Sequence, residues 1–473
     1  SRPYPRGLCV CCRPEMGCKL ALGIVLATVV VAVAVLSGLA QRAGHKFGND
    51  VQAPDHTRPD LWIHDSACDY VGGIVAAEDI TVLPLLSDGR AVALADEDYR
   101  MEVWHMRGGA ASAPEGAIFA LDIAGRELHR LQIENFPDTV AFHPHGIHFL
   151  PSQFAEEHSG EGEGTFLGLL YVVSHAYRRG GERIEVLEVW DVSATAAAGG
   201  APVRLSYRQS VTSDEYTERL MGIGNDVAVL SEGEFFVTQY LTFPDNRNGR
   251  QEGGWRQPLD EAAFLIPVLL DIKATAVWHC TYDPVGLGHA GSDLSEVTTE
   301  PHCVVALETV AANGIHVKRT TGEVYVVECI DRAVVVTEAV ATGAGREKRL
   351  EERRRIELAF ACDNLEIDQR TGRAFCGSVA KASMHAAHVK AAVMFPHGIP
   401  PSEGQGVPCS LGGAEEVLLD EGRAGGAVMV DTSRLCGGVS VGALAEHSGK
   451  SEVLLGSWCS EGILICPAPP TFG

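Results

Sequence analysis

Short runs rich in β-branched and aromatic residues, separated by turn-forming residues, recur along most of the chain and limit its fold more than any other feature. Such runs are typical of strands joined by hairpins. In residues 315–330, Thr-Thr-Gly separates two alternating Val-rich stretches, as in a hairpin. Because long amphipathic helical patterns are nearly absent beyond residue 40, the predicted class is all-β. The other clear runs are 117–123, 166–177, 184–193 and 226–240.

The spread of the hairpins favours one closed propeller over several separate sandwiches. The chain has 473 residues, 46% of them hydrophobic and 21% charged, which is a globular composition. No long acidic or Pro/Ser-rich hinge divides the hairpins, and a propeller can enclose many of them in one domain. Three stretches are expected to be inserted loops: 194–202, 284–302 and 395–414.

The net charge of −24 argues against a nucleic-acid partner, because a phosphate backbone is bound through clustered Lys and Arg. Divalent cations are the more natural partners of an acidic chain. The one strongly basic run, GREKRLEERRRIEL at 345–358, is interpreted as a solvated face or a long connection. A basic binding site there is the less favoured alternative.

Residues 20–40 carry no charged side chain and predict a transmembrane helix. At about 1.5 Å per residue, a helix of this length can cross a hydrocarbon core about 30 Å thick. Basic residues on its N-terminal side place the N-terminus in the cytoplasm and predict a single-pass type II membrane protein with a lumenal or extracellular catalytic domain. A cleaved signal peptide, which would give a secreted form, is the alternative.

The predicted organisation therefore has four parts. Residues 1–19 form a cytoplasmic Cys-rich leader, 20–40 a signal anchor, 41–66 a polar linker and 67–473 the propeller domain. Juxtamembrane cysteines are candidates for palmitoylation, whereas a zinc site would need a second ligand pair. The remaining cysteines would lie in an oxidising compartment, with their pairing open. The leader cysteines are Cys9, Cys11, Cys12 and Cys18.

Couplets of Asn, Asp and Glu lie directly before several of the predicted strands. Short side-chain oxygens are the ligands that Ca²⁺ prefers, and about 6–8 oxygens can converge from several strand starts. The alternative is that these are ordinary turn residues. The couplets are Glu78-Asp79, Asn225-Asp226, Asn313-Gly314 and Asp363-Asn364.

Histidines form a second group, with His143, His145 and His148 in FHPHGIHFL and His175 in YVVSHAY. Alternation puts His143 and His145 on one face of an extended segment, as a zinc site would require, but the H-E-x-x-H pattern is absent. Strand-end histidines with satisfied hydrogen bonds are the simpler interpretation.

Ser440 lies in Gly-Val-Ser-Val-Gly, which matches the nucleophile elbow of serine hydrolases. That elbow needs a following helix and a downstream acid and histidine. No helical pattern follows Ser440, and only His447 lies beyond it. A serine hydrolase is therefore disfavoured.

Taken in order, the couplets and histidines resemble the paraoxonase/arylesterase family of six-bladed β-propellers. The resemblance runs from about Cys68 to Cys466. Its motifs are Cys68 ten residues before Glu78-Asp79, Phe142–Ile147, Leu170–His175, Asn225-Asp226, Ala312–Ile315, Asp363-Asn364 and Leu464–Cys466.

The resemblance implies two calcium ions. The catalytic Ca²⁺ would be held by Glu78, Asn225, Asn313, Asp363 and Asn364. The structural Ca²⁺ would be held by Asp79, Asp226 and the backbone carbonyl of Ile147. The first ion would act as a Lewis acid on an ester or lactone carbonyl and stabilise the oxyanion.

The resemblance also implies that His145 deprotonates the attacking water, that His175 orients it or relays the proton, and that Cys68 and Cys466 form a disulfide. Two positions depart from the family pattern. Ser174 stands where the family usually has Asn, and Ser378 falls where the family has a free cysteine.

The first functional hypothesis is therefore a membrane-displayed, calcium-dependent hydrolase of lactones and aryl esters. The alternative is a non-enzymatic propeller that keeps calcium for stability and binds a partner through its loops. A propeller of the gluconolactonase type is a narrower third reading, disfavoured by the paired Glu78-Asp79 and the Cys68–Cys466 closure.

Overall fold

A computed structural model provides the structure. It describes residues 67–97, 115–154, 164–175, 182–195, 199–214, 224–240, 266–285, 297–343, 346–358, 361–378, 412–430, 439–458 and 460–469, together with residues 37, 62–63 and 216. The predicted leader 1–19, and all but Ser37 of the predicted anchor 20–40, lie outside these residues. Within the described part, no helix is both long enough and apolar enough to cross a membrane.

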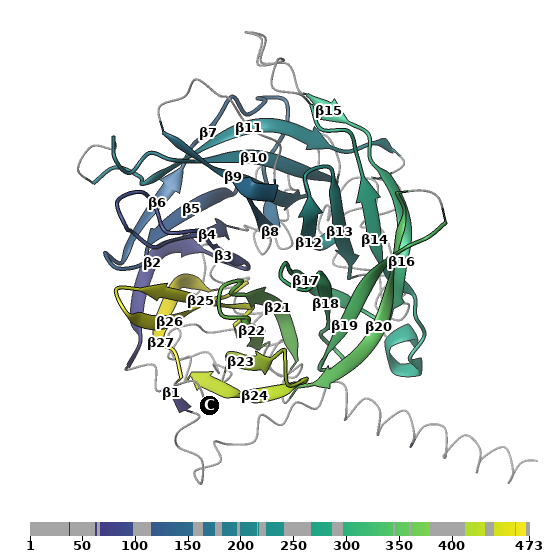
Figure 1. Cartoon of the computed structure of the whole chain (residues 1–473). Helices are drawn as coiled ribbons and strands as arrows, with labels where there is room; N and C mark the ends of the chain where they lie inside the picture. Colours follow the sequence, from purple (N-terminus) through teal and green to yellow (C-terminus); the bar gives the residue numbers. More distant parts are fainter. Residues whose placement is uncertain are drawn as a thin grey trace, which may run out of the picture.

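The described strands form an all-β propeller, as the sequence predicts, with sheets arranged around a central axis (Figure 1). The first sheet contains β3 (Ile80–Val82), β4 (Val92–Glu97), β5 (Ala117–Asp122) and β6 (Glu127–Leu131). The second contains β8 (Pro144–Pro151), β9 (Thr165–Ser174), β10 (Arg183–Asp191) and β11 (Val203–Val211), with β7 (Ile133–Glu134) and β15 (Thr298–Thr299) paired to β11.

Two further sheets have four strands each. One contains β12 (Gly224–Ser231), β13 (Glu234–Gln239), β14 (Thr275–Thr281) and β16 (His302–Thr309). The other contains β17 (Ala312–Lys318), β18 (Glu323–Glu328), β19 (Ala333–Ala341) and β20 (Lys348–Glu357). The predicted hairpin at 315–330 is confirmed as β17–β18, with Gly322 in the left-handed region at φ 75°.

The last sheet has nine strands and joins the two ends of the described chain. It contains β21 (Cys362–Ile367), β22 (Arg373–Ser378), β23 (Gly412–Leu418), β24 (Arg423–Val430), β25 (Val441–His447), β26 (Lys450–Gly456), β27 (Glu461–Pro467), β2 (Asp69–Val75) and β1 (Trp62–Ile63).

Six separate blades, implied by the resemblance, are not observed, because the described strands form five hydrogen-bonded sheets. A short pairing of β22 with β25, at Phe375↔Gly442 and Cys376↔Val441, merges neighbouring groups of strands into the nine-stranded sheet. The innermost strands β3, β8, β12, β17, β21 and β25 contact one another in cyclic order (Figure 1). The ring is therefore closed, and the starts of these strands converge near its axis.

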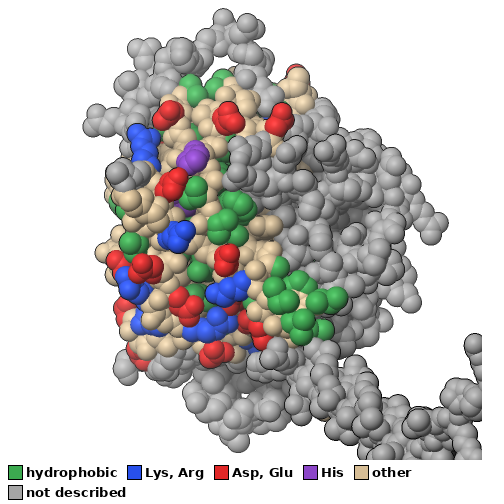
Figure 2. Space-filling model, turned by 90° about the vertical axis from the view of Figure 1, so that its right-hand side faces the viewer, with side chains coloured by type: hydrophobic (Ala, Val, Ile, Leu, Met, Phe, Trp, Pro, Cys, Tyr) green, Lys and Arg blue, Asp and Glu red, His purple; other side chains and the backbone are tan. Residues whose placement is uncertain are grey.

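The basic run at 345–358 includes β20, an outer strand. Arg353 forms ion pairs with Glu338 and Glu351, and Arg355 forms one with Glu328. Figure 2 shows basic and acidic side chains interspersed on this side of the molecule. The run is thus a solvated face with internal charge pairing.

The ring is closed covalently as well as by hydrogen bonds. Strand β2 pairs with β27, and a disulfide joins Cys68, which precedes β2, to Cys466 within β27. Two further disulfides, Cys280–Cys303 and Cys362–Cys376, each link adjacent strands.

Replacing both Cys68 and Cys466 by Ala should lower the free energy of unfolding by about 5 kcal/mol, against about 3 kcal/mol for the Cys280–Cys303 pair. The first bridge closes a separation of 398 residues and the second one of 23, so the first restricts the unfolded chain more. Denaturant titration of both double variants would measure the difference. Equal losses would contradict this account of ring closure.

Candidate metal and catalytic site

Two Gly-Ile pairs allow neighbouring inner strands to approach closely and hydrogen-bond to one another. The backbone N–H of Ile147 donates to Oδ2 of Asp79 at 2.8 Å, and that of Ile315 donates to Oδ2 of Asp226 at 2.7 Å. A side chain at the preceding glycines would not fit. A Cβ on Gly146 would lie 2.5 Å from Cα of Asp226. The acidic couplet of one inner strand is thus fixed by the backbone of the next.

The second Gly-Ile pair brings Asn313 to the last couplet. A Cβ on Gly314 would lie 2.7 Å from the carbonyl oxygen of Asp363 and 2.8 Å from Cα of Asn364. The two backbones can approach this closely because glycine has no side chain. The requirement explains why glycine follows Asn313 directly in the sequence.

Glu78, His145 and Asn225 form one buried chain of contacts. Nδ1 of His145 lies 2.8 Å from Oε2 of Glu78, and Nε2 of His145 lies 3.0 Å from Nδ2 of Asn225. A carboxylate only accepts hydrogen bonds, so the His145 proton belongs on Nδ1. Nε2 then accepts from the Asn225 amide and is the basic nitrogen of the ring.

Three buried amide oxygens in this region have no hydrogen-bond partner, namely Oδ1 of Asn225, Asn313 and Asn364. The amide nitrogens of two of them are engaged, because Asn225 Nδ2 contacts His145 and Asn364 Nδ2 donates to the carbonyl oxygen of Glu78 at 3.3 Å. Leaving a buried acceptor unsatisfied costs about 1–3 kcal/mol. These oxygens, beside the carboxylates of Glu78 and Asp363, fit a hard cation such as Ca²⁺.

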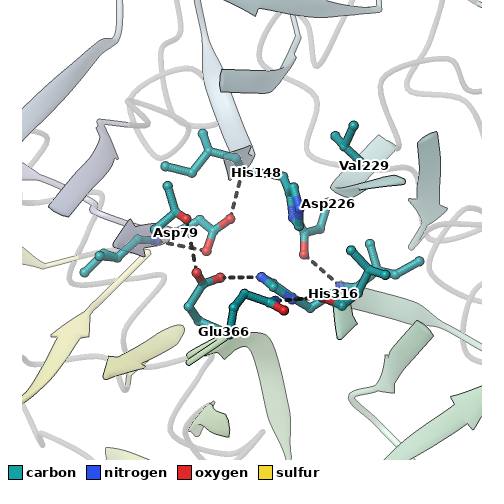
Figure 3. A network of polar contacts seen from close by, with 12 residues as sticks. Asp79, His148, Asp226, Val229, His316 and Glu366 are labelled. Atoms are coloured by element: carbon teal, nitrogen blue, oxygen red, sulfur yellow. Dashed lines mark hydrogen bonds and ion pairs between the residues drawn. The ribbon is translucent and has the colours of Figure 1, made fainter. Parts of the chain in front are cut away.

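A second group of charged residues adjoins Asp79 and Asp226, as Figure 3 shows. Oε2 of Glu366 lies 3.0 Å from Nε2 of His316, while Oε1 of Glu366 accepts from the Thr81 hydroxyl at 3.1 Å. The His148 and His316 rings lie with centroids 4.7 Å apart. Strands β3, β8, β12, β17 and β21 all contribute to the group.

The charges in this group fit a bound cation. Burial raises the pKa of Asp79 to about 7, and the nearby Glu366 carboxylate also raises it. Hydrogen bonds from the backbones of Ile147 and Ile80 lower this pKa but do not offset the increase. Burial, followed by the charge of Asp79, raises the pKa of Asp226 well above its usual range. Carboxylates buried near one another resist ionisation unless a positive charge compensates them.

One positive group of the protein lies near this cluster. Nη2 of Arg319 lies 3.0 Å from Nε2 of His148 and 3.1 Å from the carbonyl oxygen of Val229. Burial lowers the pKa of Arg319 to about 10. The pKa of His148 is lowered well below its usual value by burial and by the charges of His316 and Arg319. A neutral His148 beside Arg319 is the consequence.

The structure brings His175 next to His145, with ring centroids 5.0 Å apart and an angle of 46° between the rings. Nδ1 of His175 contacts both carboxylate oxygens of Glu182, at 2.9 and 3.1 Å. Sequence reasoning missed Glu182 and Glu366. Glu182 lies opposite His175 across the β9–β10 hairpin, and this position in the sequence could have identified it.

Ser440 and His143 occupy supporting positions. Ser440 Oγ donates to the carbonyl oxygen of Glu78 at 2.9 Å, and the Ser440 motif leads into strand β25 rather than a helix. The backbone N–H of His143 donates to the Ser174 hydroxyl at 3.3 Å. The serine that replaces the family's usual Asn therefore still forms a hydrogen bond to the histidine segment. No group of three or more His, Cys, Asp and Glu side chains suited to a metal occurs among the described residues.

Comparisons with known proteins give structural likenesses at low sequence identity. No family model and no curated protein matches the chain. A solved protein provisionally named a gluconolactonase is 13% identical with a TM-score of 0.41, over 88% of this chain and 97% of that one. A gluconolactonase from Xanthomonas campestris is 12% identical with a TM-score of 0.36, over 84% and 100%.

A luciferin-regenerating enzyme is 9% identical with a TM-score of 0.39, over 84% of this chain and 91% of that one. Likenesses this distant do not assign a family. The propeller fold is assigned from the sheets of this chain itself.

Proposed function

We propose that this protein hydrolyses lactones and aryl esters at a calcium site on the propeller axis, with a second, structural calcium ion beside it. The observation that carries the proposal is the set of three buried Oδ1 atoms without hydrogen-bond partners, next to Glu78 and His145. An arrangement of hard oxygen ligands beside a basic nitrogen suits hydrolysis of a polarised carbonyl.

The proposed ligands divide between the two ions as the sequence motifs suggest. Glu78, Asn225, Asn313, Asp363 and Asn364 would hold the catalytic ion, and Asp79, Asp226 and the carbonyl of Ile147 the structural one. Bound in the first position, Ca²⁺ would polarise the substrate carbonyl and stabilise the oxyanion.

The protein's own groups supply the base and its orientation. Glu78 and Asn225 hold the two ring nitrogens of His145, which fixes the direction of the ring. Nε2 is the atom proposed to take the proton from the attacking water, and the Asn225 amide must release Nε2 for that step because the nitrogen has a single lone pair. The His175 ring packs next to the His145 ring, and we propose that it keeps the His145 ring in position during that step.

The order of the sequence motifs, similar to that of the paraoxonase/arylesterase family, supports the substrate class of lactones and aryl esters. The uncharged stretch 20–40 and the basic residues before it suggest how the enzyme is displayed. We propose a single-pass type II anchor at residues 20–40 with the catalytic domain in the lumen or outside the cell, or a secreted form if the anchor is cleaved.

The test measures hydrolysis of phenyl acetate and of a δ-lactone by the purified full chain, with calcium, with EGTA, and with calcium restored after EGTA. We expect EGTA to abolish turnover and added calcium to restore it. The Asn313→Ala variant should lose both turnover and calcium affinity. Calcium binding in calorimetry without any turnover would replace this proposal by the non-enzymatic binding propeller.

A further inference from the structure

Strand register places Glu182 and His175 at opposite positions of one hairpin. In the antiparallel pair β9–β10, Ser174 pairs with Arg183. The next positions outward are His175 directly after β9 and Glu182 directly before β10, so the two side chains face each other at the end of the pair. The paired ends of two strands therefore set this contact.

The contact itself is short and buried. Nδ1 of His175 lies 2.9 Å from Oε1 and 3.1 Å from Oε2 of Glu182, and the two side chains are 0% and 2% exposed. A carboxylate there holds the imidazole proton on Nδ1, which leaves Nε2 as the acceptor nitrogen. Buried carboxylate–imidazole pairs of this kind fix both the tautomer and the ring direction.

Neighbouring groups hold Glu182 in place. The Thr212 hydroxyl donates to the backbone carbonyl of Glu182 at 2.7 Å, and the buried Tyr216 lies close enough for the Glu182 charge to act on it. A Cβ on Gly224 would lie 2.9 Å from Oε1 of Glu182. Since Gly224 directly precedes Asn225, the carboxylate packs against the strand that carries a proposed calcium ligand.

We propose that Glu182 is a positioning residue that fixes the His175 ring beside His145, an inference that rests on the proposed hydrolysis. The water proton goes to His145 as the water oxygen bonds to the carbonyl carbon and the carbonyl π electrons move to the carbonyl oxygen. These electrons then re-form the carbonyl as the bond from its carbon to the leaving oxygen breaks, and His145 returns the proton to that oxygen. Glu182 exchanges no proton with the substrate; it holds the His175 ring against which His145 packs during this transfer.

The experiment compares Glu182→Gln, Glu182→Ala and the control Glu185→Gln in the full chain. Glu185 is a similarly buried carboxylate three residues further along, on β10, but it accepts a hydrogen bond from the Ser210 hydroxyl at 2.7 Å and lies 3.7 Å from Nε of Arg183 instead of contacting a histidine. The readouts are kcat and KM for a δ-lactone, calcium affinity by calorimetry, and the ¹⁵N signals of His175, which report its tautomer.

Glu182→Gln should lower kcat about 10- to 100-fold while KM and the calcium Kd each change less than about twofold. Glu182→Ala should also lose the Nδ1–H signal of His175, and Glu185→Gln should keep kcat within about threefold of the parent. Glutamine preserves shape at the site, so a folding failure of the alanine variant leaves the comparison intact.

Two results would overturn the positioning role alone: an unchanged kcat in Glu182→Gln, or a fall in kcat that follows an equal loss of calcium affinity. The second would mean that Glu182 acts by supporting the strand of Asn225. An inactive parent chain would instead remove the proposed function, and the positioning role with it.

Discussion

Changing Asp363 to Asn should weaken binding of the catalytic calcium at least about 100-fold and abolish most lactone hydrolysis at micromolar calcium. The proposed ligand set contains only two carboxylates, Glu78 and Asp363, and Glu78 already contacts His145. The substitution removes one negative charge and leaves the shape of the side chain almost unchanged. Calorimetric titration with Ca²⁺ measures the affinity directly.

Asp122→Asn is the matched control for this prediction. Asp122 is also buried, but its Oδ1 accepts from the Gly125 backbone at 2.9 Å, away from the proposed ligands. Calcium affinity should stay at the parent value in this variant. Parent-like affinity in Asp363→Asn would instead remove Asp363 from the ligand set.

Changing His145 to Gln should lower kcat at least about 100-fold and leave calcium affinity within a few-fold of the parent. Glutamine can still donate to Glu78, but it lacks the basic ring nitrogen that contacts Asn225. Steady-state kinetics at saturating calcium, combined with calorimetry, separate the loss of a base from the loss of the metal.

His279→Gln provides the comparison, since His279 is buried on β14 between Glu234 and the backbone of Lys348. Activity should survive that change. If His145→Gln kept parent activity, hydrolysis would need no histidine base, and the positioning of His175 by Glu182 would have no role in turnover.

Local patterns were enough to predict the all-β propeller, whereas the choice of site residues depended on the family resemblance. Alternation in 315–330 predicted β17–β18. The couplets Asn225-Asp226 and Asp363-Asn364 lie at the starts of the inner strands β12 and β21. Glu366 was missed because a polar residue in an alternating strand pattern is expected to face solvent, whereas the structure buries it. Its partner His316 is brought to it only by the packing of β17 against β21.

The number of sheets could not be predicted for a related reason. The bridge between β22 and β25 depends on how closely two backbones approach, and a Cβ on Gly377 would lie only 2.2 Å from the carbonyl carbon of Ser440. Hydrophobic patterning indicates which residues face inward, but it does not reveal where neighbouring groups of strands touch.

Ring closure by β2 and β27 also affects biosynthesis. Because β2 is made near the beginning of the described chain and its partner β27 last, the nine-stranded sheet cannot be completed while the C-terminal part is still being translated. Cys68 cannot form its disulfide until Cys466, 398 residues later, has been made. In the meantime its thiol can react with other cysteines. Nascent chains should therefore depend on chaperones and disulfide isomerases until the last strand has been made.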